Sequence, residues 1–235
     1  MDLKVCCLSL DISTANKEDA HRYIEENLDH DIFLLPEYYT EVIDTKLMSY
    51  ENKLVIYSSK HRDNRNSGKV IGEGLDLTFS KIKLTPWEKE LKAGNEICYF
   101  EFKGVKCAVI ICFDIEFPEI AIELKLNQVE VLFVPSATEG ELGYQRINRC
   151  ASSRSVELCC AVITCNLIGE SDHEMVDKNT GGNNCYFPSQ SLFKDYTNEI
   201  SIPQKSGDSI SSFVIPIDKL RAQRAITDET NPFHY

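Results

Sequence analysis

The sequence has no run of lysines or arginines and no long hydrophobic segment. Its 235 residues include 25 Lys and Arg against 37 Asp and Glu, which gives a formal net charge of −12 at pH 7. A surface of this charge repels nucleic-acid backbones and disfavours nucleic-acid binding. No stretch approaches the roughly 18 consecutive apolar residues of a membrane-spanning helix, and the N-terminus lacks the pattern of a signal peptide. We expect a protein that binds neither nucleic acid nor membrane.

The ten cysteines show no metal-binding pattern. No two of them have Cys-x-x-Cys spacing, and none of the five histidines completes a zinc motif with them. Most lie within apolar runs, where a reduced thiol acts as a small apolar side chain. These features predict a reducing, cytoplasmic environment and no metal site.

Apolar runs alternate with helical periodicity along the chain, as in α/β proteins. Residues 3–10 and 31–35 predict buried strands with an amphipathic helix between them. Residues 105–111 and 129–134 repeat this arrangement around a helix that begins at Pro118. Further strands are expected at residues 54–58, 75–79, 97–102 and 161–164, and further helices at 144–158 and 218–225.

The two strand–helix–strand segments resemble each other faintly, which suggests two similar half-sheets of parallel strand pairs. The polar segment 63–68 is predicted to be a turn or loop. Residues 181–217 look mainly β, with turns. Because the chain contains no linker, we expect a single α/β domain over residues 1–235.

Reactive side chains follow two of the predicted strands. Glu37 comes directly after Pro36, which ends the strand at 31–35, and Cys112 ends the run at 105–111. In α/β sheets, functional groups gather just beyond the carboxyl ends of the strands. The two side chains are therefore candidates for one site.

A cysteine nucleophile needs a base and a cation that meets the developing oxyanion. A carboxylate such as Glu37 can serve as the base if a low-dielectric environment raises its pKa toward neutrality. Lys81 and Lys83 would share one side of a continuing strand, so the residues alone do not choose between them. Taken singly, each candidate also fits an ordinary surface or core position, and only the combination suggests a site.

Three segments resemble, in order, the signature blocks of the nitrilase superfamily of carbon–nitrogen hydrolases. They are Leu34-Leu-Pro-Glu37-Tyr38, Phe79-Ser-Lys81-Ile-Lys-Leu-Thr-Pro-Trp-Glu88, and Val109-Ile-Ile-Cys112-Phe-Asp-Ile-Glu-Phe-Pro-Glu119. The likeness extends through Val134-Pro-Ser-Ala137 and Arg154-Ser-Val-Glu157, so it spans nearly the whole chain. The block around the cysteine is long and specific, whereas the first block alone would be a weak signal.

The resemblance assigns the positions that the residues left open. Lys81 falls on the family's catalytic lysine, and Lys83 falls where the family usually has histidine. Ser80 replaces the usual arginine. Glu88 falls on the second glutamate of the family. The replacements at Ser80 and Lys83 bear on substrate preference. The stretch from Glu37 to Lys81 is shorter than the family pattern leads us to expect.

The mechanism implied by the resemblance uses Glu37, Lys81, Glu88 and Cys112. Glu37 takes the thiol proton of Cys112, and the thiolate attacks the amide carbon. The Lys81 ammonium and the backbone N–H of Phe113 hold the oxyanion. Glu88 orients Lys81 and hydrogen-bonds the substrate or Glu37. No metal or organic cofactor is required.

The fold implied by the resemblance is a four-layer α-β-β-α sandwich with two mixed β-sheets. Members of the family typically pair so that the sandwich continues across a dimer. We therefore expect a homodimer or higher homo-oligomer, with the helix at 144–158 as a candidate part of the interface.

The expected function is hydrolysis of a small amide with release of ammonia or an amine. The same residues could hydrolyse a nitrile, or pass the acyl group to an amine rather than to water. A non-catalytic binding protein on this fold is an alternative of another class, and a papain-like Cys–His enzyme using His173 lacks a supporting pattern. The sequence does not name the acyl group or the leaving amine.

Overall fold

The first β-sheet combines strands from both ends of the chain. The computed structural model describes residues 1–14, 19–39, 51–172 and 177–226. The order in this sheet is β14-β1-β2-β3-β4-β5, and β1, β2 and β3 run parallel to one another. The other three strands are antiparallel to their neighbours. The bounds are β1 (Asp2–Ser9), β2 (Ile32–Leu34), β3 (Leu54–Arg62), β4 (Arg65–Gly72), β5 (Leu75–Ser80) and β14 (Ser209–Pro216).

The second sheet has a matching construction. Its order is β13-β12-β9-β8-β7-β6, with a parallel centre of β7, β8 and β9 and antiparallel strands on both sides. Its bounds are β6 (Cys98–Phe102), β7 (Val105–Val109), β8 (Val131–Ser136), β9 (Ala161–Asn166), β12 (Gly182–Tyr186) and β13 (Glu199–Ile200). A separate antiparallel pair joins β10 (Gly169–Glu170) to β11 (Lys178–Asn179).

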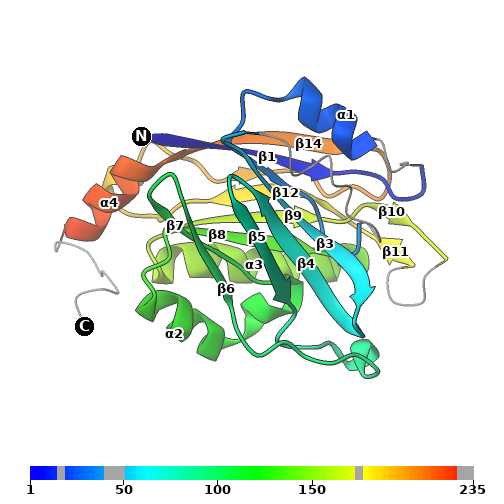
Figure 1. Ribbon diagram of the computed structural model, residues 1–235. Helices are drawn as coiled ribbons and strands as arrows, with labels where there is room; N and C mark the ends of the chain where they lie inside the picture. Colours follow the sequence, from blue (N-terminus) through cyan, green and yellow to red (C-terminus); the bar gives the residue numbers. More distant parts are fainter. Residues whose placement is uncertain (15–18, 40–50, 173–176, 227–235) are drawn as a thin grey trace.

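Helices cover the outer faces of the two sheets (Figure 1). Helix α1 (Asp19–Glu26) lies over the first sheet, and α2 (Pro118–Leu126) and α3 (Gly140–Glu157) lie over the second. Helix α4 (Ile217–Ala225) follows β14, and the described residues also form the short 3₁₀ turns η2 (Pro86–Glu88), η3 (Cys112–Glu116) and η4 (Ser191–Phe193). The predicted four-layer sandwich is confirmed. No described helix has the length and apolar character needed to cross a membrane.

Alternation along β1 explains why the first sheet lies between two apolar layers. Val5 and Cys7 belong to the large hydrophobic core that both sheets share. Cys6 and Leu8 point the other way, into a smaller cluster that contains Ile24 of α1. Since successive side chains of a strand face opposite sides, one apolar run supplies both layers.

The two predicted strand–helix–strand units are confirmed as parallel pairs. In the first unit β1 pairs with β2 around α1, and in the second β7 pairs with β8 around α2.

The predicted loop at 63–68 is wrong over most of its length. Only Asp63 and Asn64 form the turn, with φ of +54° and +61°, and Arg62 pairs with Arg65 across it. Two consecutive residues with positive φ match the right-handed twist of a tight hairpin. The strand therefore resumes at Arg65 and carries the polar Asn66 into the protein interior, where it is buried.

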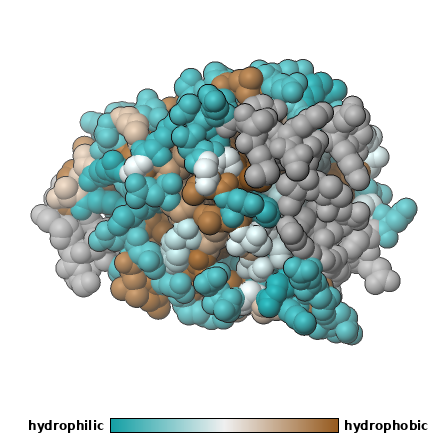
Figure 2. Space-filling model, in the orientation of Figure 1, coloured by the Kyte–Doolittle hydropathy of each residue, from teal (hydrophilic) through white to brown (hydrophobic). Residues whose placement is uncertain are grey.

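The surface is mainly hydrophilic on the face shown in Figure 2, with hydrophobic patches between. One hydrophobic area lies at the lower left, where Figure 1 places α2. This helix exposes Ile122 and Leu126. No disulfide bond links any of the ten cysteines, all of which the structure describes, and only Cys98 and Cys150 are not fully buried.

Candidate active site

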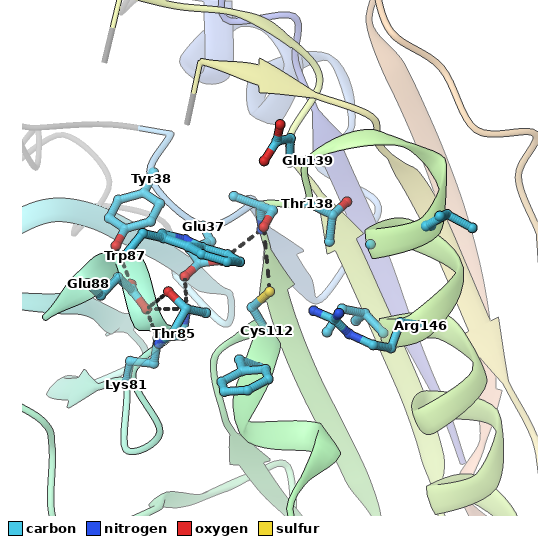
Figure 3. Close-up of a pocket in the computed structure, with 15 residues that line it drawn as sticks. Glu37, Tyr38, Lys81, Thr85, Trp87, Glu88, Cys112, Thr138, Glu139 and Arg146 are labelled. Carbon is cyan, nitrogen blue, oxygen red and sulfur yellow. Dashed lines mark hydrogen bonds and ion pairs between the residues drawn. The ribbon is translucent and has the colours of Figure 1, made fainter. Parts of the chain in front are cut away.

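The ends of three strands from two sheets converge on one pocket. Glu37 follows β2 of the first sheet, whereas Cys112 and Ala137 follow β7 and β8 of the second. All three residues line the same cavity, whose volume is about 240 Å³. Figure 3 shows Cys112 near the centre of this pocket, with Glu37, Lys81 and Glu88 on one side. The site is therefore built across the boundary between the two sheets.

Lys81 lies between two buried carboxylates. Its Nζ is 2.9 Å from Oε1 of Glu37 and 3.0 Å from Oε2 of Glu88. The three residues are only 1–2% exposed. Ions removed from water persist in a protein only when they are paired and hydrogen-bonded. Each carboxylate is therefore stabilised by the Lys81 ammonium, and the ammonium is stabilised by both carboxylates.

Neutral donors complete the surroundings of Glu88. Asn66 Nδ2 donates to Oε1 of Glu88 at 2.8 Å and to Oε1 of Glu37 at 2.6 Å, which ties the two carboxylates together. The Tyr38 hydroxyl also donates to Glu88. Thr85 donates to Oε2 of Glu88 from its backbone N–H at 2.8 Å and from its hydroxyl at 2.7 Å. Glu88 therefore accepts hydrogen bonds at both of its oxygens.

The thiol of Cys112 is presented by a strained turn. The φ of Cys112 is +45°, a left-handed conformation that costs a non-glycine residue about 1–3 kcal/mol. Its Sγ lies 3.6 Å from the carbonyl oxygen of Ala137, and the N–H of Ala137 donates to Oε2 of Glu37 at 2.7 Å. The thiol and the Glu37 carboxylate thus meet at the same backbone residue.

The surroundings move the pKa values of the two glutamates apart. Burial raises the pKa of Glu37 above its ordinary value, Lys81 opposes this shift, and repulsion from Glu88 adds to it. Burial acts on Glu88 in the same sense, but Lys81 and the hydrogen bonds from Tyr38, Thr85 and Asn66 outweigh it and lower its pKa to about 2. Glu88 is therefore a fixed anion, whereas burial favours the protonated form of Glu37.

The lysine and the thiol respond to the same charges. Burial disfavours the Lys81 ammonium, but the Glu37 carboxylate, with Cys112 and Glu88, holds its pKa above the ordinary value. Burial raises the pKa of the Cys112 thiol, and the charge of Glu37 raises it further, while Lys81 opposes both. The resting thiol therefore keeps its proton until a base removes it.

Asp114 joins the segment that carries the thiol to the segment that carries the lysine. Its Oδ2 accepts from the N–H of Ile111 at 2.9 Å, and its Oδ1 accepts from the N–H groups of Ile82 at 3.1 Å and Lys83 at 2.7 Å. Burial raises the pKa of Asp114 to about 7, although these three donors favour the carboxylate. The Asp114 side chain thus holds the backbone next to Cys112 and the backbone next to Lys81 in fixed positions.

Every side chain predicted for the site lines the pocket. Glu37, Lys81, Glu88 and Cys112 all do so, as does Phe113, whose backbone N–H was assigned to the oxyanion. Lys83 does not line it, and its Nζ lies 2.7 Å from Oε1 of Glu119 at the surface.

Several residues of the site were not anticipated from the sequence. They are Asn66, Tyr38, Thr85 and Arg146. The turn-forming pair Asp63-Asn64 could have placed Asn66 on a strand. Tyr38 and Thr85 lie within the segments that resemble the family, whereas no local pattern distinguishes Arg146. Among residues 1–14, 19–39, 51–172 and 177–226, no group of three or more His, Cys, Asp or Glu side chains is arranged to hold a metal ion.

Comparison with known proteins gives a consistent result. Residues 44–191 match the family model of carbon–nitrogen hydrolases. The chain is 27% identical over 207 residues to the 2-oxoglutaramate amidase of Bacillus subtilis, which covers 73% of this chain and 78% of that protein. It is 36% identical over 80 residues to the probable hydrolase YhcX of the same organism, which covers 33% of this chain but only 16% of YhcX. The crystal structure of Saccharomyces cerevisiae Nit3, a nitrilase-superfamily member, has a TM-score of 0.74 at 19% identity and covers 100% of this chain and 97% of its own.

Replacement of Asp114 by asparagine should destabilise the fold. The amide keeps one oxygen but turns an N–H₂ donor toward at least one backbone N–H that now has no acceptor. An unsatisfied buried donor costs about 1–3 kcal/mol, so urea denaturation should show the free energy of unfolding lowered by about this amount. Glu119→Gln, an exposed acid in the same sequence block, is the matched control and should change it by less than about 0.5 kcal/mol. Equal stability of the two variants would contradict the role given to Asp114.

Proposed function

Because the chain belongs to the carbon–nitrogen hydrolase family, we propose that it hydrolyses a small amide through a thioester on Cys112. The observation that carries the proposal is the position of one buried carboxylate. Glu37 is hydrogen-bonded to Lys81 on one side and, through Ala137, lies next to the Cys112 thiol on the other. A base, a cation and a nucleophile thus share one pocket.

In the first half of the reaction, Glu37 accepts the thiol proton as sulfur attacks the amide carbon. The Lys81 ammonium and the N–H of Phe113 stabilise the oxyanion that forms. Glu37, now a carboxylic acid, returns the proton to the nitrogen as the C–N bond breaks. Ammonia or an amine leaves, and the acyl group stays on Cys112 as a thioester.

In the second half, water replaces the amine. Glu37 accepts a proton from the water as its oxygen attacks the thioester carbon, and the same two donors stabilise the second oxyanion. The carbon–sulfur bond then breaks, the carboxylic acid leaves, and the proton held by Glu37 returns to the thiolate. The raised pKa of Glu37 suits this repeated exchange, whereas the low pKa of Glu88 suits a group that only holds Lys81.

An amide is favoured over a nitrile as the substrate because the relative aligned over most of its length is an amidase. We further propose that the protein works in the cytoplasm, where its thiols stay reduced, and that it forms a homodimer. Exposed Ile122 and Leu126 on α2, with Leu142 and Val156 on α3, supply apolar surface for such pairing.

Ammonia release from a panel of short amides, ureas, carbamoyl amines and nitriles tests the function. The wild-type protein should release ammonia from at least one amide, and Cys112→Ala should reduce this release to background because no acceptor for the acyl group remains. Cys150→Ala, on α3 outside the pocket, is the control and should keep full activity. Turnover that survives in Cys112→Ala, or a wild-type protein that hydrolyses nitriles only, would contradict the proposal.

The two neighbouring lysines give a second test. Lys81→Ala should lower kcat by about 10²–10³, the usual cost of losing an oxyanion donor. Lys83→Ala should leave kcat nearly unchanged because that side chain pairs with Glu119 at the surface. Circular dichroism should establish that both variants are folded, since Lys81→Ala leaves two buried carboxylates facing each other. An essential Lys83 beside a dispensable Lys81 would refute the assignment.

A further inference from the structure

The pocket contains a second cation that the proposed mechanism does not use. Arg146 of α3 lines the same cavity as Cys112. Lys81 is already paired with two carboxylates, so Arg146 is the remaining positive group among the lining residues that the structure describes. Figure 3 shows its guanidinium directed toward the thiol, on the opposite side of Cys112 from Glu37, Lys81 and Glu88.

The position of Arg146 is fixed relative to the nucleophile. Its Nε donates to Oε1 of Glu116 at 2.7 Å, and Glu116 is the last residue of η3, the turn that begins with Cys112. Its guanidinium carbon also lies 6.0 Å from the centre of the Phe113 ring in the same turn. The arginine on α3 is therefore held at a set distance from the thiol.

The terminal edge of this guanidinium remains available to a ligand. Within the described part of the chain, the side chain of Arg146 makes a single hydrogen bond, which goes to Glu116. Of this side chain, 54% is exposed. Two parallel N–H groups on a planar fork match the two oxygens of a carboxylate. Of the described lining residues, Glu139 is an exposed acid, and Figure 3 shows it beyond Thr138, away from this edge.

We propose that the substrate carries a carboxylate and that Arg146 binds it. This inference rests on the proposed function and narrows it to a class of amide. Glu37 must reach the leaving nitrogen to protonate it, so the amine departs on the Glu37 side of the thiol. Arg146 lies on the other side, where the acyl chain extends. The carboxylate therefore belongs to the acyl part, and the substrate is a monoamide of a dicarboxylic acid.

The test compares monoamides of dicarboxylic acids with the matching diamides, which differ only in charge at the far end. Succinamate, glutaramate and adipamate cover a range of chain lengths. At the best length, wild-type kcat/KM for the monoamide should exceed that for the diamide by about ten- to hundredfold, as expected for a charged hydrogen-bonded pair. Arg146→Met should lose this preference mainly through KM, and Arg146→Lys should keep part of it.

Arg149→Met is the matched control. Arg149 lies on the same helix and bonds to Gln145 outside the pocket, so its removal changes the net charge equally and should leave the preference intact. A preference that survives in Arg146→Met, or equal rates on monoamide and diamide in the wild type, would overturn the inference. Faster hydrolysis of N-acyl amino acids, which carry the carboxylate on the amine side, would overturn it too.

A binding measurement tests the role of Arg146 independently of the proposed hydrolysis. The Cys112→Ala variant cannot be acylated, so calorimetry can measure how tightly it binds the intact amide. Its affinity for glutaramate, or for the homologue of best length, should be about ten- to hundredfold higher than that of the double variant Cys112→Ala/Arg146→Met. If the wild-type protein hydrolyses no amide, the proposed function fails, and this difference still decides whether Arg146 binds the carboxylate. Equal affinities in the two variants would refute it.

Discussion

The buried Lys81 ammonium, held between Glu37 and Glu88, is the interaction on which the rest of the site depends. Three ions with almost no contact with water cannot persist singly, because removal of one partner leaves an uncompensated buried charge. The fold compensates for the lost solvation with hydrogen-bond donors from three different segments. Asn66 bridges both carboxylates, and Tyr38 and Thr85 satisfy Glu88.

The two glutamates accept different sets of hydrogen bonds, and their pKa values shift in opposite directions. Glu88 accepts from several neutral donors in addition to Lys81, which fixes its charge. Glu37 accepts hydrogen bonds from Asn66 and Ala137 as well as Lys81, but burial outweighs the charge of Lys81 and raises the pKa of Glu37. The left-handed turn at Cys112 and the backbone of Ala137 bring the thiol to this carboxylate. Charge arrangement and backbone strain therefore both support the proton transfer that we propose.

The sequence predicted the parts of the structure that depend on local pattern. Apolar strands ending in a proline or a cysteine placed Glu37 and Cys112 at strand ends, where the structure has them. It missed Asn66 because a tight two-residue turn was interpreted as a longer loop. Arg146 could not be predicted, since an arginine on a polar helix face has no local mark, and only tertiary packing brings it beside the thiol. Residues 40–50, within the short stretch before Lys81, lie outside the described residues.

Detection of the acyl-enzyme in Glu37→Gln and Glu88→Gln tests the central claim, the division of roles between the glutamates. Folded samples of both variants and of the wild type are mixed with an amide that the wild-type protein hydrolyses, quenched in acid and mapped by mass spectrometry. The account predicts an acyl group on Cys112 in the wild type and in Glu88→Gln, and none in Glu37→Gln, where the proton acceptor is gone. A Glu37→Gln protein that still forms and hydrolyses the thioester, beside a Glu88→Gln protein that forms none, would contradict it.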